Sequence, residues 1–369
     1  MRQPLKNWFT EPGAYVLVDG QFGSTGKGLM AGYIADLFVR DDGMAFNYVT
    51  TNAGPNSGHT AYFRTATPNS VQSGNPVDDH LEKIVTQQLP IAGVFATKYG
   101  YPVPMVLNAG AIIDEEILNR EHSQYGGKLY VHPCAALIDQ VHAVLDKQTT
   151  AQIASTGKGV GPAMAQKLMR LDMDCVASKK YLPVLPPGRD SWDNLWDWGT
   201  DRVFVETAQG YSLGINSSRF YPYTTSRECT VMQAIADARI PAQMVRKVIA
   251  TYRTYPIRVG NTQGSSGGCY PDQEETSWEA LRLKPELTTV TGRIRRVFTW
   301  SRVQFRESIA ANRPDAIFLN FMNYIGRSAD QADFIEQVVD DYQKVMGRFP
   351  EDLLIGHGRR SSDVVVYNV

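Results

Sequence analysis

Two copies of the pentapeptide STGKG give this sequence its strongest chemical signal, because each combines glycines with a lysine. The first copy, Ser24–Gly28, follows the apolar run Ala14–Asp19 and precedes a helix-like segment. Glycines let several backbone N–H groups point toward one anion, and a following helix adds a positive dipole. The second copy, Ser155–Gly159, also precedes a helical pattern. We expect two phosphate sites; a glycine-rich turn without a ligand and a chance duplication are the alternative interpretations.

The first turn departs from the standard phosphate-binding loop GxxxxGK[ST]. Gln21 stands at the position of the first glycine, and Gly28 replaces the serine or threonine that would bind magnesium. Lys27 keeps its place and supplies a positive point charge. The turn is therefore expected to hold a polyphosphate without following the standard motif.

Two further segments carry side chains that could act on phosphoryl or carboxyl groups. His59 lies in the loop NAGPNSGHT, residues 52–60, and could act as an acid or stabilise a phosphoryl oxygen. Arg293, Arg295 and Arg296 stand within four consecutive residues, and guanidinium groups bind carboxylates and phosphates in a bidentate manner. A loop histidine without a catalytic role and a solvated basic face are the alternatives.

The elements that must position these groups alternate between strand and helix patterns. Ala14–Asp19, Ala316–Leu319 and Asp352–Ile355 are short apolar runs typical of buried strands. Alternation with helices predicts an α/β fold with a mainly parallel central sheet flanked by helices. No segment resembles an interdomain linker, so we expect one domain over residues 1–369 with helical and loop elaborations. The tryptophan-rich segment 183–200 is interpreted as an irregular connection packed on the core, with a tryptophan-lined binding surface as the alternative.

Helical periodicity is clearest after the first turn and near the end of the chain. The first helix carries an apolar face made by Met30, Ile34, Leu37 and Phe38. The second is expected to begin with a capping box formed by Ser328 and Gln331 and to end at Gly347. Its apolar face is expected to contain Phe334, Val338, Tyr342 and Val345.

Composition excludes several classes of function. Lys and Arg total 37 against 38 Asp and Glu, whereas a protein that binds duplex DNA or RNA usually shows a basic excess. Neither a signal peptide nor an apolar run of about 18 residues is present, so no membrane association is expected. The four cysteines form no CxxC pair and are expected to be free thiols, and the six histidines lack the spacing of a zinc site.

Taken together and in this order, these segments resemble the adenylosuccinate synthetase family. The family patterns are VxxGxQWGDEGKGK, HNAGHT, TTGRGIGPAYxDK, EGAQG, YPxVTSS, STRVGxGPFPTE and TTGRxRR. The matching segments here are VLVDGQFGSTGKG, PNSGHT, STGKGVGPAMAQK, ETAQG, YPYTTS, YPIRVG and TGRIRR, at residues 16–28, 55–60, 155–167, 206–210, 221–226, 255–260 and 291–296. The resemblance spans nearly the whole chain and implies the family's P-loop-NTPase-like fold.

The resemblance also implies a reaction in two steps. The 6-oxygen of a purine monophosphate is phosphorylated by a nucleoside triphosphate, and the amine of L-aspartate then displaces that phosphate. By position, the catalytic residues would be Ser24, Lys27 and His59. Mg²⁺ would be bound by Ser24 and the carbonyl of Gly58. The family's homodimer would bring Arg170 to the active site of the partner subunit.

The same resemblance, applied position by position, implies which residues bind the triphosphate, the purine monophosphate and the aspartate. The triphosphate set is Gly23, Thr25, Gly26, Lys27, Gly28, Gly58, His59, Thr60, Arg295, Asn320, Asn323 and Gly356. The purine monophosphate set is Ser24, Asn56, Ser155, Thr156, Arg170, Gln209, Thr225 and Arg293. The aspartate set is Thr289, Val290, Thr291, Gly292, Arg293 and Arg295.

Two departures from the family pattern change the expected substrates. Ser24 replaces the aspartate of GDEGKG, and a shorter side chain leaves room for the 2-amino group of guanine. In this respect the chain resembles most the phage 2-aminoadenylosuccinate synthetases, which act on dGMP. Asn323 replaces the aspartate of LTKLD that accepts hydrogen bonds from guanine, and an amide matches adenine instead. We therefore expect dGMP, L-aspartate and ATP or dATP as substrates.

Three other interpretations remain open at this stage. One is ordinary adenylosuccinate synthesis from IMP and GTP. Another is a nucleotide-binding switch without ligase activity, although a switch needs neither the second STGKG turn nor the arginines. The third is an enzyme that lost its base at Ser24 and only binds nucleotide. The family implies a cytoplasmic location, including the cytoplasm of an infected bacterial host.

Overall fold

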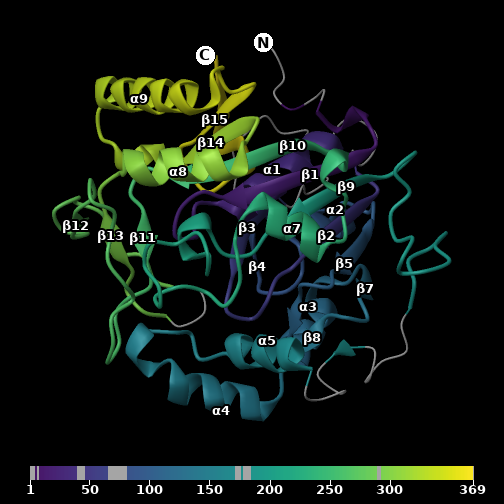
Figure 1. Ribbon diagram of the computed structural model, residues 1–369. Coiled ribbons are helices and arrows are strands. Elements are labelled where there is room, and N and C mark those ends of the chain that lie inside the picture. The colour runs from purple at the N-terminus through teal and green to yellow at the C-terminus, as the bar shows by residue number, and fades with distance from the viewer. Residues whose placement is uncertain are drawn as a thin grey trace.

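A nine-stranded sheet forms the centre of the molecule (Figure 1). The computed structural model describes residues 5, 8–39, 46–64, 81–170, 176–177, 184–288 and 292–368. All neighbouring strands in this sheet are parallel except the last pair, β15 and β16. In sheet order the strands are β16 (Val364–Tyr367), β15 (Asp352–Gly356), β14 (Ala316–Asn320), β10 (Val245–Arg253), β1 (Gly13–Asp19), β9 (Arg202–Glu206), β2 (Tyr48–Thr51), β5 (Pro104–Leu107) and β7 (Lys128–Val131). The predicted parallel sheet is confirmed.

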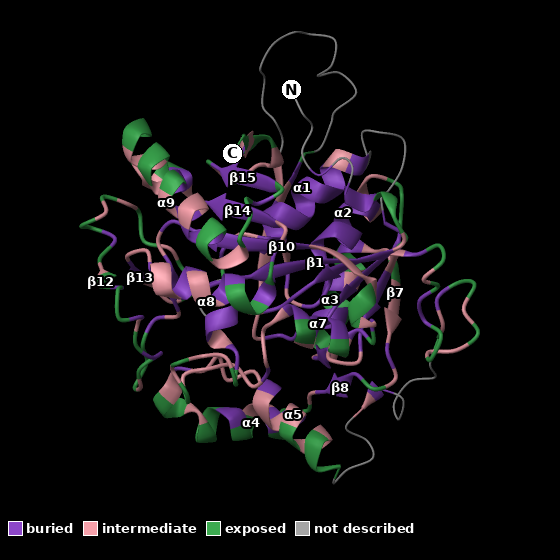
Figure 2. Ribbon diagram, turned by 45° about the horizontal axis from the view of Figure 1, so that its top comes forward, coloured by how far each residue is buried: buried purple, intermediate pink, exposed green. Residues whose placement is uncertain are grey.

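Helices cover both faces of the sheet, and for that reason the central strands are apolar on both sides. Alternate residues of β1 serve different cores: Tyr15 and Leu17 belong to one, Val16 and Val18 to the other. The first core contains residues of α1 (Lys27–Val39), α2 (Ile91–Lys98) and α3 (Glu115–Tyr125). The second contains residues of α7 (Val231–Asp237), α8 (Arg302–Asn312) and α9 (Ser328–Met346). Figure 2 shows the strands buried between these layers.

The two predicted helices are present, with one error at a helix end. In α9, Val338 and Tyr342 are buried, and Gly347 ends the helix in the left-handed conformation at φ 72°. The capping box is wrong because Arg327, not Ser328, is the N-cap residue. The amide of Gln331 instead donates to the carbonyls of Met322 and Ile325, at 3.1 and 2.8 Å.

Smaller elements stand beside the carboxyl ends of the central strands (Figure 1). They include two antiparallel sheets and a short parallel pair. Their strands are β3 (His59–Arg64) with β4 (Leu81–Thr86), β11 (Ile257–Arg258) with β13 (Arg296–Phe298) and β12 (Glu275–Thr276), and β6 (Ile112–Ile113) with β8 (Ala136–Leu137). Two packed helices, α4 (Gln140–Thr149) and α5 (Val160–Met169), lie below them. Ligands of parallel sheets bind at this edge.

The tryptophan-rich segment 184–200 has no regular helix or strand and packs on the second core. Trp196 is buried in the second core, and its indole N–H donates to the carbonyl of Ala238 at 2.9 Å. The tryptophan-rich segment is thus an irregular connection packed on the core, as predicted. Cys134, Cys229 and Cys269 are free thiols, and Cys175 lies outside the described residues. Over the part of the chain that the structure describes, no helix is long and apolar enough to cross a membrane.

Candidate active site

The turn after β1 is organised by a carboxylate that the motif comparison did not single out. Asp19, the last residue of β1, is buried and accepts hydrogen bonds from the backbone N–H groups of Gln21, Gly23 and Thr25 at 2.9–3.4 Å. Because one side chain accepts hydrogen bonds from three alternate residues of the turn, it fixes the path of the loop around the carboxylate. An aspartate that ends a buried strand and opens a glycine-rich turn is the sequence signal that could have found it.

Lys27 is tied into the same group of residues. Its ammonium lies 3.1 Å from Asp19 Oδ2 and donates to the carbonyl of Gln209 at 2.6 Å. The lysine is therefore held between the first turn and the turn after β9, where it borders two cavities. Charge-assisted bonds of this kind are short and orient the ammonium.

Close packing explains why glycine stands at position 28 and why the side chain of Thr25 is buried. A Cβ atom at Gly28 would lie 2.5 Å from the carbonyl oxygen of Thr60, so the helix start fits against β3 only with glycine. Thr25 is fully buried, and its hydroxyl bonds Asp19 and Thr251. Its side chain therefore faces the core, and Thr25 is not among the residues that line the cavity, so the predicted triphosphate contact stays a prediction.

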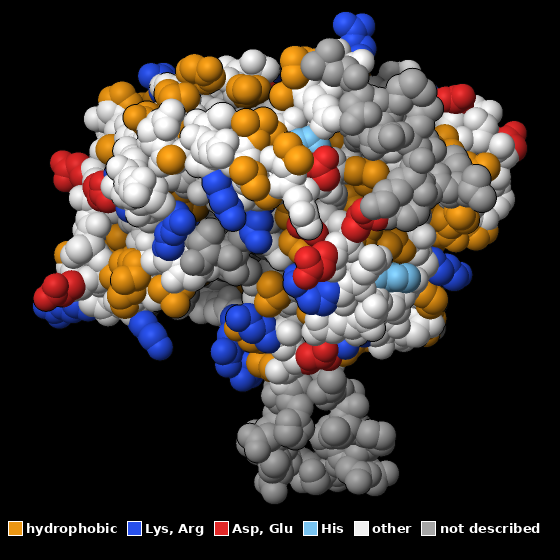
Figure 3. All heavy atoms as spheres, turned by 90° about the horizontal axis from the view of Figure 1, so that it is seen from below, with side chains coloured by type: hydrophobic (Ala, Val, Ile, Leu, Met, Phe, Trp, Pro, Cys, Tyr) orange, Lys and Arg blue, Asp and Glu red, His pale blue; other side chains and the backbone are white. Residues whose placement is uncertain are grey.

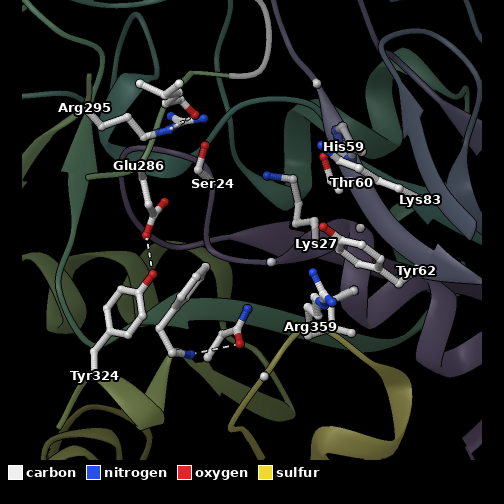
Figure 4. A pocket seen from close by; sticks show the side chains of 18 of the residues that line it. Ser24, Lys27, His59, Thr60, Tyr62, Lys83, Glu286, Arg295, Tyr324 and Arg359 are labelled. Carbon is white, nitrogen blue, oxygen red and sulfur yellow. Dashed lines mark hydrogen bonds between the residues drawn. The ribbon is translucent and has the colours of Figure 1, made fainter. Parts of the chain in front are cut away.

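The first cavity, of about 830 Å³, lies over this turn. It contains most of the predicted triphosphate set, and Tyr62, Lys83, Glu286, Phe321 and Arg359 were not predicted. Figure 4 shows Ser24 and Arg295 on one side, His59 and Thr60 on the other, and Lys27 between them. The predicted residues that line it are Ser24, Gly26, Lys27, Gly28, Gly58, His59, Thr60, Arg295, Asn320 and Asn323. The buried amide of Asn320 also bonds the carbonyl of Thr25 and the N–H of Phe321.

A second, smaller cavity of about 100 Å³ shares one wall with the first. The residues common to both are Ser24, Lys27, Gly58, His59 and Arg295. Gly23, predicted to contact the triphosphate, lines this second cavity instead. Among the described residues around it, none is Asp or Glu, so the side chains facing this space are neutral or positive.

The second STGKG turn lines a third cavity of about 150 Å³. It continues the second one, because both are lined by Asn56, Thr156, Gln209 and Val259. Ser155 and Thr225 complete the predicted monophosphate residues found here. Behind the turn, the buried carboxylate of Asp146 accepts from Gly159 N at 2.8 Å and from the hydroxyls of Thr150 and Ser155. The two STGKG turns thus border one connected set of cavities.

His59 begins β3 and faces the boundary of the first two cavities. Burial and the nearby charge of Lys27 lower the pKa of His59 to about 3. The imidazole is therefore neutral near pH 7, and its N–H group can donate a hydrogen bond. A neutral histidine can polarise a carbonyl oxygen in this way.

Arg253 connects the first cavity to the Ser24 turn. Its guanidinium is fully buried, pairs with Glu286 and donates to the carbonyl of Ser24 at 3.2 Å. It also stacks on the ring of Phe321, 4.0 Å from the centroid, while Tyr324 donates to Glu286 at 2.8 Å. Glu286, Phe321 and Tyr324 all line the first cavity. Arg253 therefore connects the wall of the first cavity to the Ser24 turn.

Several predicted residues lie elsewhere. Gly356 is buried at the end of β15, where a Cβ would lie 2.4 Å from Asn320 Oδ1, and Gly358 and Arg359 line the cavity in its place. Arg170 follows α5 in the left-handed conformation and lines none of the three cavities of its own chain.

The predicted aspartate loop is described only in part. Arg293 lines none of the three cavities, and its backbone pairs with Thr288. Gly292 turns with φ 67° and donates its N–H to the carbonyl of Thr288. Arg295 does border the first two cavities, and burial and the charge of Arg253 lower its pKa to about 10. Thr289, Val290 and Thr291 lie outside the described residues.

Comparison with known proteins decides the family. Residues 190–345 match the family model for adenylosuccinate synthetase. The N6-succino-2-amino-2'-deoxyadenylate synthase of Vibrio phage phiVC8 is 35% identical over 338 residues, which cover 88% of this chain and 89% of that protein. An adenylosuccinate synthetase of Pyrococcus horikoshii is 30% identical over 291 residues, 76% of each chain. The chain belongs to the adenylosuccinate synthetase family.

A solved structure of an adenylosuccinate synthetase-like enzyme has the same fold. The succinoaminodeoxyadenylate synthetase of cyanophage S-2L, bound to dGMP and to dATP as an energy donor, superposes with a TM-score of 0.79. It is 30% identical, and the match covers 97% of this chain and 96% of that one. The family and fold predicted from the motifs are confirmed, and the chain is a C–N-forming ligase of the adenylosuccinate synthetase family.

Proposed function

We propose that this ligase joins L-aspartate to C6 of dGMP with hydrolysis of ATP or dATP, giving the 2-amino-2'-deoxyadenylosuccinate monophosphate used for diaminopurine nucleotides. The observation that carries the proposal is the meeting of two cavities at Ser24, Lys27 and His59. The larger cavity has the volume and the cations for a nucleoside triphosphate. The smaller ones join the second STGKG turn, where a purine monophosphate would place its 6-oxygen at the shared wall.

The chemistry of the shared wall fits phosphorylation of a purine 6-oxygen followed by its displacement. Lys27 would balance the charge of the transferring phosphoryl group, which supplies most of the catalysis in such transfers. His59 is neutral and would donate a hydrogen bond to the 6-oxygen as charge develops there. The aspartate amine would then attack C6 from the side of the 288–295 loop, and inorganic phosphate would leave.

Ser24 supports guanine as the base. In the second cavity the described lining residues include no carboxylate, and Ser24 is exposed to it with a left-handed backbone at φ 57°. A hydroxyl leaves space beside N1 for the 2-amino group and can accept or donate a hydrogen bond. The relative from phage phiVC8, which is an N6-succino-2-amino-2'-deoxyadenylate synthase, supports the same substrate class.

Asn323 supports adenine in the triphosphate. It is exposed at the first cavity, and its amide is available for a base edge, whereas Asn320 is bonded within the fold. In the family pattern LTKLD, an aspartate carboxylate accepts hydrogen bonds from guanine. The amide of Asn323 instead offers one donor and one acceptor, which matches adenine. The dATP bound by the cyanophage enzyme is consistent with this choice.

Mg²⁺ fits the oxygen donors of the shared wall. The Ser24 hydroxyl and the Gly58 carbonyl both border it, and Mg²⁺ usually takes few protein ligands beside waters and substrate phosphates. No cluster of three or more His, Cys, Asp or Glu that could hold a metal occurs among the described residues, which agrees with binding through the triphosphate. When bound, the ion would neutralise charge on the transferring phosphoryl group.

A homodimer would complete the site. α4 and α5 lie at the lower end of the molecule in Figure 1, the end from which Figure 3 is viewed, and both helices carry exposed apolar side chains. These exposed residues are Val141, Val144, Leu145, Leu168 and Met169. Arg170 directly follows this surface, so a second copy packed on α4 and α5 would bring its Arg170 toward the monophosphate cavity.

Product analysis tests the whole proposal. The protein is mixed with L-aspartate, Mg²⁺, one of dGMP, GMP or IMP, and one of ATP, dATP or GTP, and products are identified by mass spectrometry. We expect the succinylated 2-amino product from dGMP with ATP or dATP. Product from IMP and GTP alone would establish ordinary adenylosuccinate synthesis, and nucleotide binding without any succinylated product would establish a switch or an inactive enzyme.

A further inference from the structure

Arg258 stands in the matched segment YPIRVG and is a buried cation at the third cavity, but neither the motif comparison nor the proposed reaction gave it a role. It lies on β11, directly before Val259, which borders the second and third cavities. The residue is only 3% exposed, yet it lines the third cavity together with Thr156 and Thr225. A buried guanidinium requires compensation for its lost hydration.

The protein supplies that compensation only in part. One nitrogen, Nη2, donates to the carbonyl of Tyr223 at 2.9 Å. The guanidinium also lies over the rings of Phe22 and Phe220, 4.4 and 5.2 Å from their centroids. Nε and Nη1 have no hydrogen-bond partner within the described part of the chain, and no carboxylate there forms an ion pair with Arg258. Burial, together with the charge of Arg296, lowers its pKa to about 9, so the group stays charged near pH 7.

The other ionisable groups of the third cavity do not neutralise it. Asp146 also borders this space, but its oxygens are bonded by Gly159 N and by the hydroxyls of Thr150 and Ser155. Arg258 is the sole Lys or Arg among the described residues that line this cavity. The remaining polar lining consists of hydroxyls and amides, which cannot balance the charge of a phosphomonoester.

We infer that Arg258 is the cation within the same subunit that binds the 5'-phosphate of the purine monophosphate. The rings of Phe22 and Phe220 contact the guanidinium but cannot neutralise its charge. A phosphomonoester dianion is a ligand class that matches a guanidinium with an uncompensated charge and with N–H groups at Nε and Nη1 that are unpaired among the described residues. This inference rests on the proposed function and adds to it a cation that does not depend on the partner's Arg170.

A comparison of nucleotide with nucleoside isolates the phosphate. Arg258→Met removes the charge but keeps a long side chain that can still contact Phe22. Calorimetric titration of the wild type and the variant with dGMP and with deoxyguanosine gives four affinities. We expect dGMP to bind about 10- to 100-fold more weakly to the variant, as for a lost charged hydrogen bond, with deoxyguanosine within about twofold of the wild type.

Two further variants complete the experiment. Arg219→Met makes the same substitution at an arginine that pairs with Glu307 and lines none of the three cavities, and it should change neither affinity. Arg258→Lys keeps the charge without the fork, so it should give an intermediate loss for dGMP. Thermal unfolding shows whether each variant is folded. If Arg258→Met does not fold, the affinities of Arg258→Lys for dGMP and deoxyguanosine are compared with those of the wild type instead.

The outcomes separate the inference from the proposed substrate. Equal weakening of dGMP and deoxyguanosine binding would mean that Arg258 only supports Phe22, and unchanged dGMP binding would mean that it has no role in the site; either result overturns the inference. If the wild type binds IMP but not dGMP, the base proposed here is wrong. The same cycle run with IMP and inosine then still tests Arg258, because the phosphate is common to both nucleotides.

Discussion

At the scale of single residues, Ser24 is where this chain departs most from its family, and its backbone allows a direct test. A left-handed φ of 57° is tolerated by Asn and Asp. Ser24→Asp restores the family carboxylate, and we expect kcat/KM for dGMP to fall by about 100-fold or more because the carboxylate meets the 2-amino group. Steady-state rates with dGMP and IMP measure the change.

Asparagine at the same position is the matched control for this variant. Ser24→Asn has nearly the same size as Ser24→Asp but no charge, so it separates crowding from electrostatics. If both variants lose dGMP turnover equally, space alone decides the substrate. If Ser24→Asp turns over dGMP as fast as the wild type, Ser24 does not select the base.

The pKa of His59 predicts how the charge at the wall shared by the first two cavities depends on pH. Its native pKa is about 3, against about 6.5 in an unfolded chain. Between these values the unfolded chain binds more protons, so His59 makes stability fall as the pH drops from about 6.5 toward 3 and does nothing above that range. We expect the His59 imidazole resonance, assigned by its loss in His59→Gln, to show no titration from pH 8 to 5.

The same variant tests the role of the neutral ring in catalysis. Glutamine keeps an N–H donor, so His59→Gln should retain more turnover than His59→Ala, for which we expect a loss of roughly 100-fold or more. A resonance midpoint near 6.5, or equal activity of the two variants, would show that the ring does not act as a neutral donor.

At the scale of elements, Arg253 joins the end of β10 to the first turn and to the wall of the large cavity. Arg253→Met leaves the Glu286 carboxylate without its main partner, and we expect the free energy of unfolding to fall by roughly 2–4 kcal/mol. It also releases Phe321 and the Ser24 carbonyl, so KM for ATP should rise. Urea unfolding and initial rates at varied ATP measure the two effects.

A double variant distinguishes positioning from stability alone. Arg253→Met with Glu286→Leu removes both charges, and replacement of a buried ion pair by apolar residues often restores stability. We expect the unfolding free energy to recover while KM for ATP stays high. Recovery of both would limit Arg253 to a structural role.

These elements also show what a single sequence can predict. β1, α1, β14, α9 and β15 were predicted because apolar periodicity is a local property of the chain, and the turn was predicted because glycine and lysine spacing is local too. The burial of Thr25 against Thr251 and of Gly356 against Asn320 could not be predicted, because it depends on distant strands. Arg253, and the role inferred for Arg258 within the matched segment YPIRVG, escaped notice for the same reason, because the fold alone shows what surrounds each arginine.

At the scale of the whole molecule, the question is whether one site needs two chains. Arg170 lines no cavity of its own subunit among the three described, and it follows the exposed apolar side chains of α4 and α5. We expect Arg170→Ala and His59→Ala each to form dimers with little activity, the first because both sites lack the partner's arginine and the second because both lack the histidine. A mixture of the two variants should therefore regain activity if Arg170 acts on the partner's site.

In a mixed dimer, the subunit that carries Arg170→Ala keeps its own His59 and receives an intact Arg170 from its partner. One of its two sites is therefore complete, and the other lacks both residues. Random exchange at equal amounts makes half of all dimers mixed, so activity should return to about a quarter of the wild-type value. If Arg170 served its own subunit, mixing would restore nothing, because every site would still lack one residue. Leu168→Glu, which places a charge on the proposed interface, should abolish the recovery and give monomers in sedimentation velocity.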